Sequence, residues 1–300
     1  TSNFRAGVNA GNSIASGGNY NVVVGDEAGT ALTTGDNNVA VGYGAGKAVT
    51  TAVQNVLIGY NAGDALNTGS INVAIGNNAL SADTKGARSV AIGYETLQNQ
   101  NFTSDTSVYN TAVGGQAGKQ ITTGTKNTLI GGLAGDAITT GGNNTAVGST
   151  ALSANTTAEG NAAVGARALE ANTTGAYNSA LGDSALRTNT TAASNSAVGQ
   201  SALQNNTTGA SNTAVGRNSL QLNTTAANNT AVGYASLGVN TTGHSLTAVG
   251  KSALSANTTS DHNTAVGTNA LTANTVGFQN TAVGSGAGTA ITTGDTNVAV

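Results

Sequence analysis

The sequence predicts an all-β protein built as a parallel β-roll or β-solenoid, with coils of 17 residues stacked on one another. The motif Asn-Thr-Ala-Val-Gly at 212–216 returns one period later at 229–233. The composition suits a thin core, because 43 residues are Gly, only 3% are aromatic, and Trp, Met, Cys and Pro are absent. A fixed period of this kind is typical of one small unit stacked many times.

The column of Val and Ile in this motif covers the whole chain, with a step of 17 residues that changes once, between Ile92 and Val113. We therefore expect residues 1–300 to form one continuous array with a four-residue insertion near 101–108. Because the pattern begins and stops within a unit, we expect a piece of a longer fibre. The column includes Val41, Ile58, Ile75, Ile92, Val113, Ile130, Val147, Val215 and Val232.

The motif itself predicts the first of two short strands in each coil. Alternation along a strand places Val147 on one face with Thr145, and Ala146 on the other face. We assign the Val/Ile column to the interior and the Ala column to the outside, where small side chains let another chain approach closely. A glycine follows the strand and turns a corner, as at Gly42, Gly59, Gly76, Gly93, Gly148, Gly216 and Gly233.

The second apolar run, four to seven residues after the corner glycine, predicts a second strand and a shared core slot. Some coils carry Gly and then an aliphatic residue, and the others carry Leu and then a polar residue. Since a slot of fixed volume accepts one aliphatic side chain, we predict that both positions face the same cavity. The aliphatic residues of this slot include Leu152, Leu169, Leu203, Leu271, Ile121 and Ile138.

An asparagine column, at Asn21, Asn38 and onward to Asn297, precedes the strand motif and departs from Asn at Ser89 and Leu246. Stacked amides can form a hydrogen-bonded ladder along the axis. The alternative is that each Asn serves only a turn, since Asn bonds readily to its own backbone. The sequence leaves both interpretations open.

Charge and reactive residues point away from catalysis. Only 8% of residues are charged, the net charge is −3, and no basic run or apolar run of 18 residues exists, so we expect no nucleic acid and no membrane insertion. Two His, no Cys and no paired carboxylates predict a protein that is not an enzyme and has no catalytic, metal or cofactor site.

The few aromatic residues are the candidate ligand surface. A tyrosine follows the corner glycine in four coils, and Tyr43 and Tyr60 are one coil apart, so that a stripe of rings could grip a sugar. The alternative is exposed turn aromatics that pack only on each other. The candidates are Tyr43, Tyr60, Tyr94, Phe102, Tyr109 and Tyr234.

The motif Ser89-Val90-Ala91-Ile92-Gly93, with its later Asn-Thr-Ala-Val-Gly copies, resembles the head repeat of trimeric autotransporter adhesins, and similar repeats occur in phage tail-fibre-like proteins. The resemblance implies a left-handed roll, three identical chains side by side, and an extracellular fibre or adhesin shaft on a cell surface or virion. Its partners would be its own copies and a surface glycan or protein receptor.

The alternative function is a monomeric solenoid that binds ice or glycans through threonine or tyrosine ladders. The threonines that would form an ice-binding ladder are Thr213, Thr230, Thr247, Thr264 and Thr281.

Overall fold

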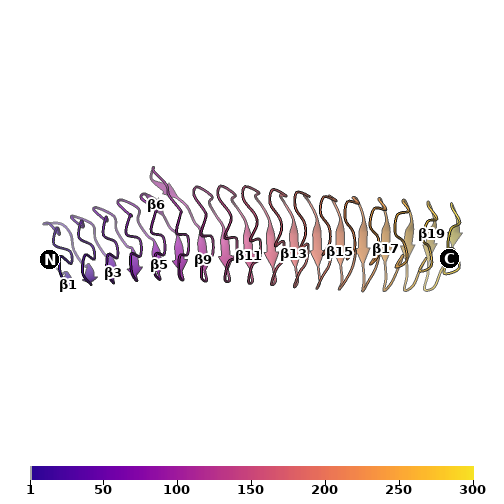
Figure 1. Ribbon diagram of the computed structural model, residues 1–300, viewed down its shortest axis with the longest axis horizontal. Helices are drawn as coiled ribbons and strands as arrows, with labels where there is room; N and C mark the ends of the chain where they lie inside the picture. The colour runs from indigo at the N-terminus through magenta and orange to yellow at the C-terminus, as the bar shows by residue number, and fades with distance from the viewer. Residues whose placement is uncertain (1) are drawn as a thin grey trace. The chain divides into compact units, whose positions relative to one another are not determined.

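The computed structural model describes residues 2–300, and these form a parallel β-solenoid without helices. The chain divides into two compact units, Thr1–Thr150 (unit 1) and Ala151–Val300 (unit 2). Within each unit the strands lie one over the next (Figure 1). Every coil adds one short strand to a parallel sheet, which is the stacking that the 17-residue period predicts.

Unit 1 stacks its main strands in chain order and in register, so that Thr128 pairs with Thr111 and Thr145. A small second sheet joins β6 to β8. The strands of unit 1 are β1 (Phe4–Ala6), β2 (Val22–Val24), β3 (Val39–Val41), β4 (Val56–Ile58), β5 (Val73–Ile75), β6 (Gly86–Ala87), β7 (Val90–Ile92), β8 (Thr106–Ser107), β9 (Thr111–Val113), β10 (Thr128–Ile130) and β11 (Thr145–Val147).

Unit 2 repeats the same arrangement without an insertion, and Ala214 pairs with Ala197 and Ala231. Its strands are β12 (Ala162–Val164), β13 (Ser179–Leu181), β14 (Ser196–Val198), β15 (Thr213–Val215), β16 (Thr230–Val232), β17 (Thr247–Val249), β18 (Thr264–Val266), β19 (Thr281–Val283) and β20 (Val298–Ala299).

The two faces of the strand are the reverse of the sequence interpretation. Ala214 is fully buried, whereas Val215 beside it keeps 37% of its surface exposed. In coils whose second run carries Leu, that side chain is buried together with a small Ala at this position, and in some coils whose second run carries Gly the larger Val23, Leu57 and Leu129 are buried here instead. The Val/Ile column therefore lies outside, at Val41, Ile58, Ile75, Ile92, Val113, Ile130, Val147, Val215 and Val232.

The second run of each coil is not a strand, which corrects the expectation of two strands per coil. Its residues form turns, and left-handed φ values recur along it, at 58° for Ser201 and 51° for Leu203. The run still bonds to the next coil, since the Leu203 N–H donates to the Ser219 carbonyl at 3.0 Å. Backbone groups are thus satisfied between coils without β geometry.

The shared core slot is visible at Gly63. A Cβ atom there would lie 2.8 Å from Leu57 Cδ2 and 2.9 Å from Leu66 Cδ1. A coil therefore needs Gly at this position when the slot is filled by an aliphatic side chain from the Ala column, such as Leu57, or from three residues later, such as Leu66. The slot residues Leu152, Leu169, Leu203, Leu271, Ile121 and Ile138 are all fully buried.

The asparagine column lies inside and forms a ladder, which resolves the two interpretations. In unit 1 the Asn55 N–H donates to Asn38 Oδ1 at 3.0 Å, and Asn55 Nδ2 donates to the Gly69 carbonyl at 3.0 Å. In unit 2 the Asn195 N–H bonds to Asn178 in the same way, at 3.0 Å. Each amide therefore ties one coil to the next within a dry core.

A second asparagine ladder runs through unit 2, at the polar position three residues after the core Leu of each coil. Asn206 Nδ2 donates to Asn189 Oδ1 at 2.9 Å and to the Gly209 carbonyl at 2.9 Å. The same carbonyl accepts from Asn195 of the first ladder at 2.9 Å. These buried asparagines begin Asn-Thr-Thr glycosylation motifs, but their amides are already held in the core.

Both breaks in the first ladder are bridged by polar side chains. Beside Ser89, Gln100 Nε2 donates to Asp83 Oδ2 at 2.6 Å and to Ser89 Oγ at 2.9 Å, and Gln100 Oε1 accepts from Asn110 at 2.9 Å.

At the other break, beside Leu246, the Ser260 hydroxyl bonds to Asn257 and accepts from Asn263 at 3.3 Å. A local cross-link therefore replaces each missing rung.

The insertion projects from unit 1 at β6 and β8, beyond the outline of the neighbouring coils (Figure 1). Its base is anchored inside, because the Phe102 N–H donates to the buried Asp83 carboxylate at 3.0 Å. Phe102 is only 7% exposed and Val108 is fully buried. The extra residues are thus held by the coil rather than merely attached to it.

Candidate functional site

The outer strand face of each unit carries a continuous column of aliphatic side chains. In unit 2 the exposed fractions are 52% at Leu181, 40% at Val198 and 46% at Val283, and in unit 1 Ile130 is 41% exposed. Their in-register pairing aligns these side chains from coil to coil. Large contiguous apolar patches are rare on monomers and mark interaction surfaces.

The neighbouring column, two residues earlier in each strand, changes character along unit 1. It is valine from β2 to β7 and threonine from β9 to β11. The sequence analysis assigned the face shared by Val147 and Thr145 to the interior, but these side chains lie on the outer face together with the Val/Ile column. The outer face is therefore wholly aliphatic over β2–β7 and mixed hydroxyl and methyl from β9 to β11.

The threonine ladder of unit 2 also lies on the outer face. Its side chains are partly or fully exposed and are paired coil to coil in register. The members are Thr213, Thr230, Thr247, Thr264 and Thr281. The ladder and the Val/Ile column together form an evenly spaced array of hydroxyl and methyl groups.

The tyrosine column stands just past the corner glycines of unit 1. Tyr43 and Tyr60 are half exposed, and their rings stack with centroids 5.5 Å apart at an interplanar angle of 13°. Tyr94 is 53% exposed two coils further on, with Asn77 between. The structure therefore brings three of the predicted aromatics into one column.

The other predicted aromatics lie elsewhere. Tyr109 is exposed, with the Arg88 guanidinium 5.7 Å from its ring centroid, and Tyr234 stands in unit 2. Phe102, predicted as ligand surface, is buried at the base of the insertion, where its N–H donates to the buried Asp83 side chain. It is therefore part of the core and not of the surface.

Charged groups flank the tyrosine column at Glu95. Its carboxylate accepts from Lys119 Nζ at 2.7 Å and from Gln116 Nε2 at 3.0 Å. These bonds, with one to Tyr94, lower the pKa of Glu95 to about 2, while the bond to Glu95 raises the pKa of Tyr94. Both partners are part-buried, with 27% of the Lys119 side chain and 14% of the Glu95 side chain exposed, so the pair fixes local geometry and adds modestly to stability.

Acid should weaken unit 1 through Glu95. Its carboxyl pKa is 4.5 ordinarily and about 2 when folded, so its contribution is complete above pH 4.5 and lost as pH falls toward 2. We expect the melting temperature of Glu95→Gln to depend less on pH over this interval than that of the parent. Burial raises the pKa of the Asp64 carboxyl, so this group favours the folded state at low pH. Asp64→Asn should remove that contribution, which runs opposite to that of Glu95. Equal acid slopes in the parent and Glu95→Gln would contradict the assignment.

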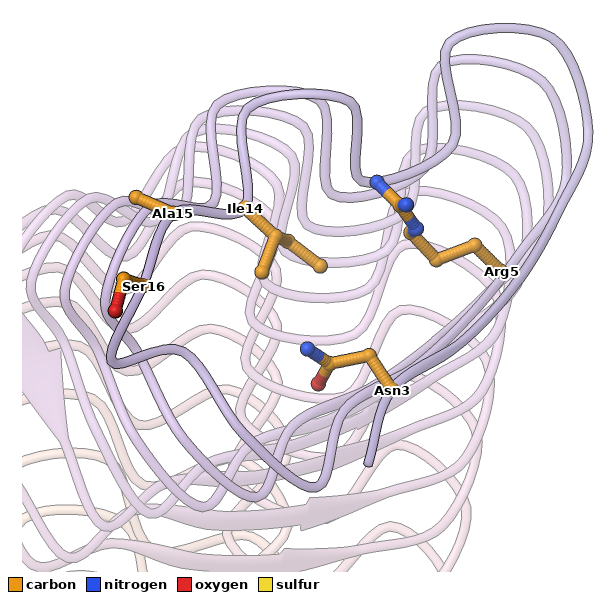
Figure 2. Close-up of a pocket in the computed structure, with 5 residues that line it drawn as sticks. All are labelled: Asn3, Arg5, Ile14, Ala15 and Ser16. Carbon is orange, nitrogen blue, oxygen red and sulfur yellow. The ribbon is translucent and has the colours of Figure 1, made fainter. Parts of the chain in front are cut away.

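One hollow of about 200 Å³ lies over the first coil and is lined by Asn3, Arg5, Ile14, Ala15 and Ser16 (Figure 2). Its polar groups are already engaged: Asn3 Nδ2 donates to the Gly18 carbonyl at 2.8 Å and the Arg5 guanidinium donates to the Gly11 carbonyl at 3.0 Å. Figure 2 shows Ile14 extending into the space between them. The hollow is the uncovered side of a coil interior.

No cluster of three His, Cys, Asp or Glu residues occurs in residues 2–300. His244 Nδ1 accepts from the Ala227 N–H at 2.9 Å, and the His244 N–H bonds to Asp261 at 2.6 Å, so this histidine braces turns. Nor do residues 2–300 hold a helix long and apolar enough to cross a bilayer.

Fold and surface together define a repeat protein of the parallel β-solenoid class with an apolar outer strand face. No model of a known protein family matches the chain, and no curated protein matches it.

Proposed function

We propose that the protein is a non-enzymatic shaft of an extracellular fibre or surface adhesin, in which identical chains pack through their outer strand faces. The observation that carries this proposal is the exposed Val/Ile column, which leaves apolar surface open on coil after coil of each unit. The likeness of the Ser89–Gly93 motif to adhesin head repeats favours three chains.

Because the Ala column is buried, the proposed contact between chains lies on the opposite, outer face of the strand. An interface built on Ala214 and its copies is wrong, since these side chains are enclosed within their own coil. The outer face offers a better contact, because a valine or isoleucine in each coil can interdigitate with the same residue of a neighbouring copy. Identical columns on identical chains match in spacing along their whole length.

Charge on this face should separate the chains. We expect the parent protein to sediment as a trimer and the variant Val215→Asp/Val232→Asp to lose affinity between chains, because the new carboxylates would be buried without partners. The control Thr208→Asp/Thr225→Asp alters an exposed turn column of the same unit and should remain trimeric. Analytical ultracentrifugation and electron microscopy measure both. A parent protein that stays a globular monomer would refute the proposal.

Ice binding is the second candidate, and the outward position of the Thr213 ladder favours it. The two candidates compete for the same face, because an interface between chains would cover these hydroxyls. A monomer whose solutions show thermal hysteresis, lost on replacing the ladder threonines, would establish this alternative instead.

A further inference from the structure

The tyrosine column of unit 1 has a gap of one coil between Tyr60 and Tyr94. Backbone bonds hold its members in register, since the Asn78 N–H donates to the Tyr60 carbonyl and the Glu95 N–H donates to the Asn77 carbonyl, both at 2.9 Å. Tyr43 and Tyr60, in adjacent coils, stack with centroids 5.5 Å apart. Where the next ring would stand, the chain has Asn77.

Tyr60 and Tyr94 therefore stand two coil steps apart in one column, or roughly 10 Å at the usual strand spacing. A flat ring placed midway would lie about 5 Å from each tyrosine, within the range of offset stacking. The ring of a ligand would thus take the place of the tyrosine that Asn77 replaces. The observed Tyr43–Tyr60 stack shows that the column accepts rings at this spacing.

The groups around the gap determine which kind of ligand ring would bind there. Asn77 is exposed, and its side-chain amide makes no hydrogen bond within residues 2–300, so it offers a donor and an acceptor at the floor. The Glu95 carboxylate beside Tyr94 disfavours anions, and the nearby Lys119 cation is already paired with it at 2.7 Å. A ring bearing neutral hydroxyl groups fits these partners better than a nucleotide or an acidic sugar.

We propose that Tyr60, Asn77 and Tyr94 form a binding slot for a neutral pyranose ring of a glycan, with the two tyrosine faces stacking on the sugar and the amide bonding to its hydroxyls. The slot names a ligand class for the surface of unit 1. It does not rest on the number of chains in the assembly, because all three residues belong to one chain.

The test uses the full chain with cellohexaose, maltohexaose and mannohexaose as neutral probes and sialyllactose as an acidic probe. With no Trp in the sequence, tyrosine fluorescence reports binding directly, and calorimetry gives the affinity. We expect at least one neutral probe to bind and sialyllactose to bind more weakly. Tyr60→Ala and Tyr94→Ala should each weaken binding about tenfold or more.

Asn77→Tyr is the decisive variant, because it fills the gap with the missing ring and should abolish binding while leaving the fold intact. Tyr234→Ala, which removes an exposed tyrosine of unit 2, is the matched control and should bind as the parent does. Circular dichroism verifies the fold of each variant.

Three results would overturn the slot: a parent that binds none of the neutral probes, an Asn77→Tyr variant that binds normally, or a preference for sialyllactose. Sedimentation of the same samples reports the chain number independently, so a failed slot and a failed trimer are distinguishable.

Discussion

Replacing Gln100 by alanine is expected to lower the free energy of unfolding by about 3 kcal/mol. The Gln100 amide donates to the buried Asp83 carboxylate at 2.6 Å and accepts from Asn110 at 2.9 Å. Truncation leaves both groups buried with one partner fewer, and Asp83 Oδ2 loses the side-chain donor that Gln100 supplies.

Urea unfolding of the parent and the variant measures this loss. Gln98→Ala is the matched control, since Gln98 is partly exposed and only its backbone is used in stacking. The control should change the free energy of unfolding by less than about 0.5 kcal/mol. If Gln100→Ala changed the free energy of unfolding as little as Gln98→Ala, the hydrogen bonds of Gln100 to Asp83, Ser89 and Asn110 would have no energetic role.

The second large effect is expected at Gly63. Gly63→Leu should destabilise by about 3 kcal/mol or more, because the new side chain enters a slot already filled by Leu57 and Leu66. Backbone strain is the smaller part of this cost, since Leu80 and Leu97 adopt the same left-handed φ in their own coils, at 54° and 50°. Steric overlap in the slot therefore dominates.

A compensating variant separates volume from backbone. Gly63→Leu/Leu57→Ala/Leu66→Asn converts this coil to the composition of a Leu coil, and it should recover most of the loss by urea unfolding. Leu57→Ala alone should destabilise, because it opens a cavity. A triple variant no more stable than Gly63→Leu would show that the slot is not shared.

The candidate surface was predictable in part. The tyrosines that follow the corner glycines indicate an exposed column, because a side chain just after a tight corner has little access to the core. The burial of Phe102 was not predictable, since nothing in its neighbours in sequence indicates that Asp83, in the preceding coil, holds its backbone inside. The same holds for Gln100, whose partners Ser89 and Asn110 meet only after coils stack.

Features that depend on spacing along the chain could be predicted from the sequence: the 17-residue coil, the in-register stacking of equivalent residues, the corner glycines and the exchange of side-chain volume between Gly63 and Leu66. Alternation along a strand states that two faces differ but not which is inside. The folded coil settles this, because the second run of each coil is buried with the face that carries Ala, or Val23, Leu57 and Leu129, and the Val/Ile column is left on the outside. The outward valines, and the surface proposed to join chains, therefore follow from which strand face the second run covers, a contact that alternation along one strand does not encode.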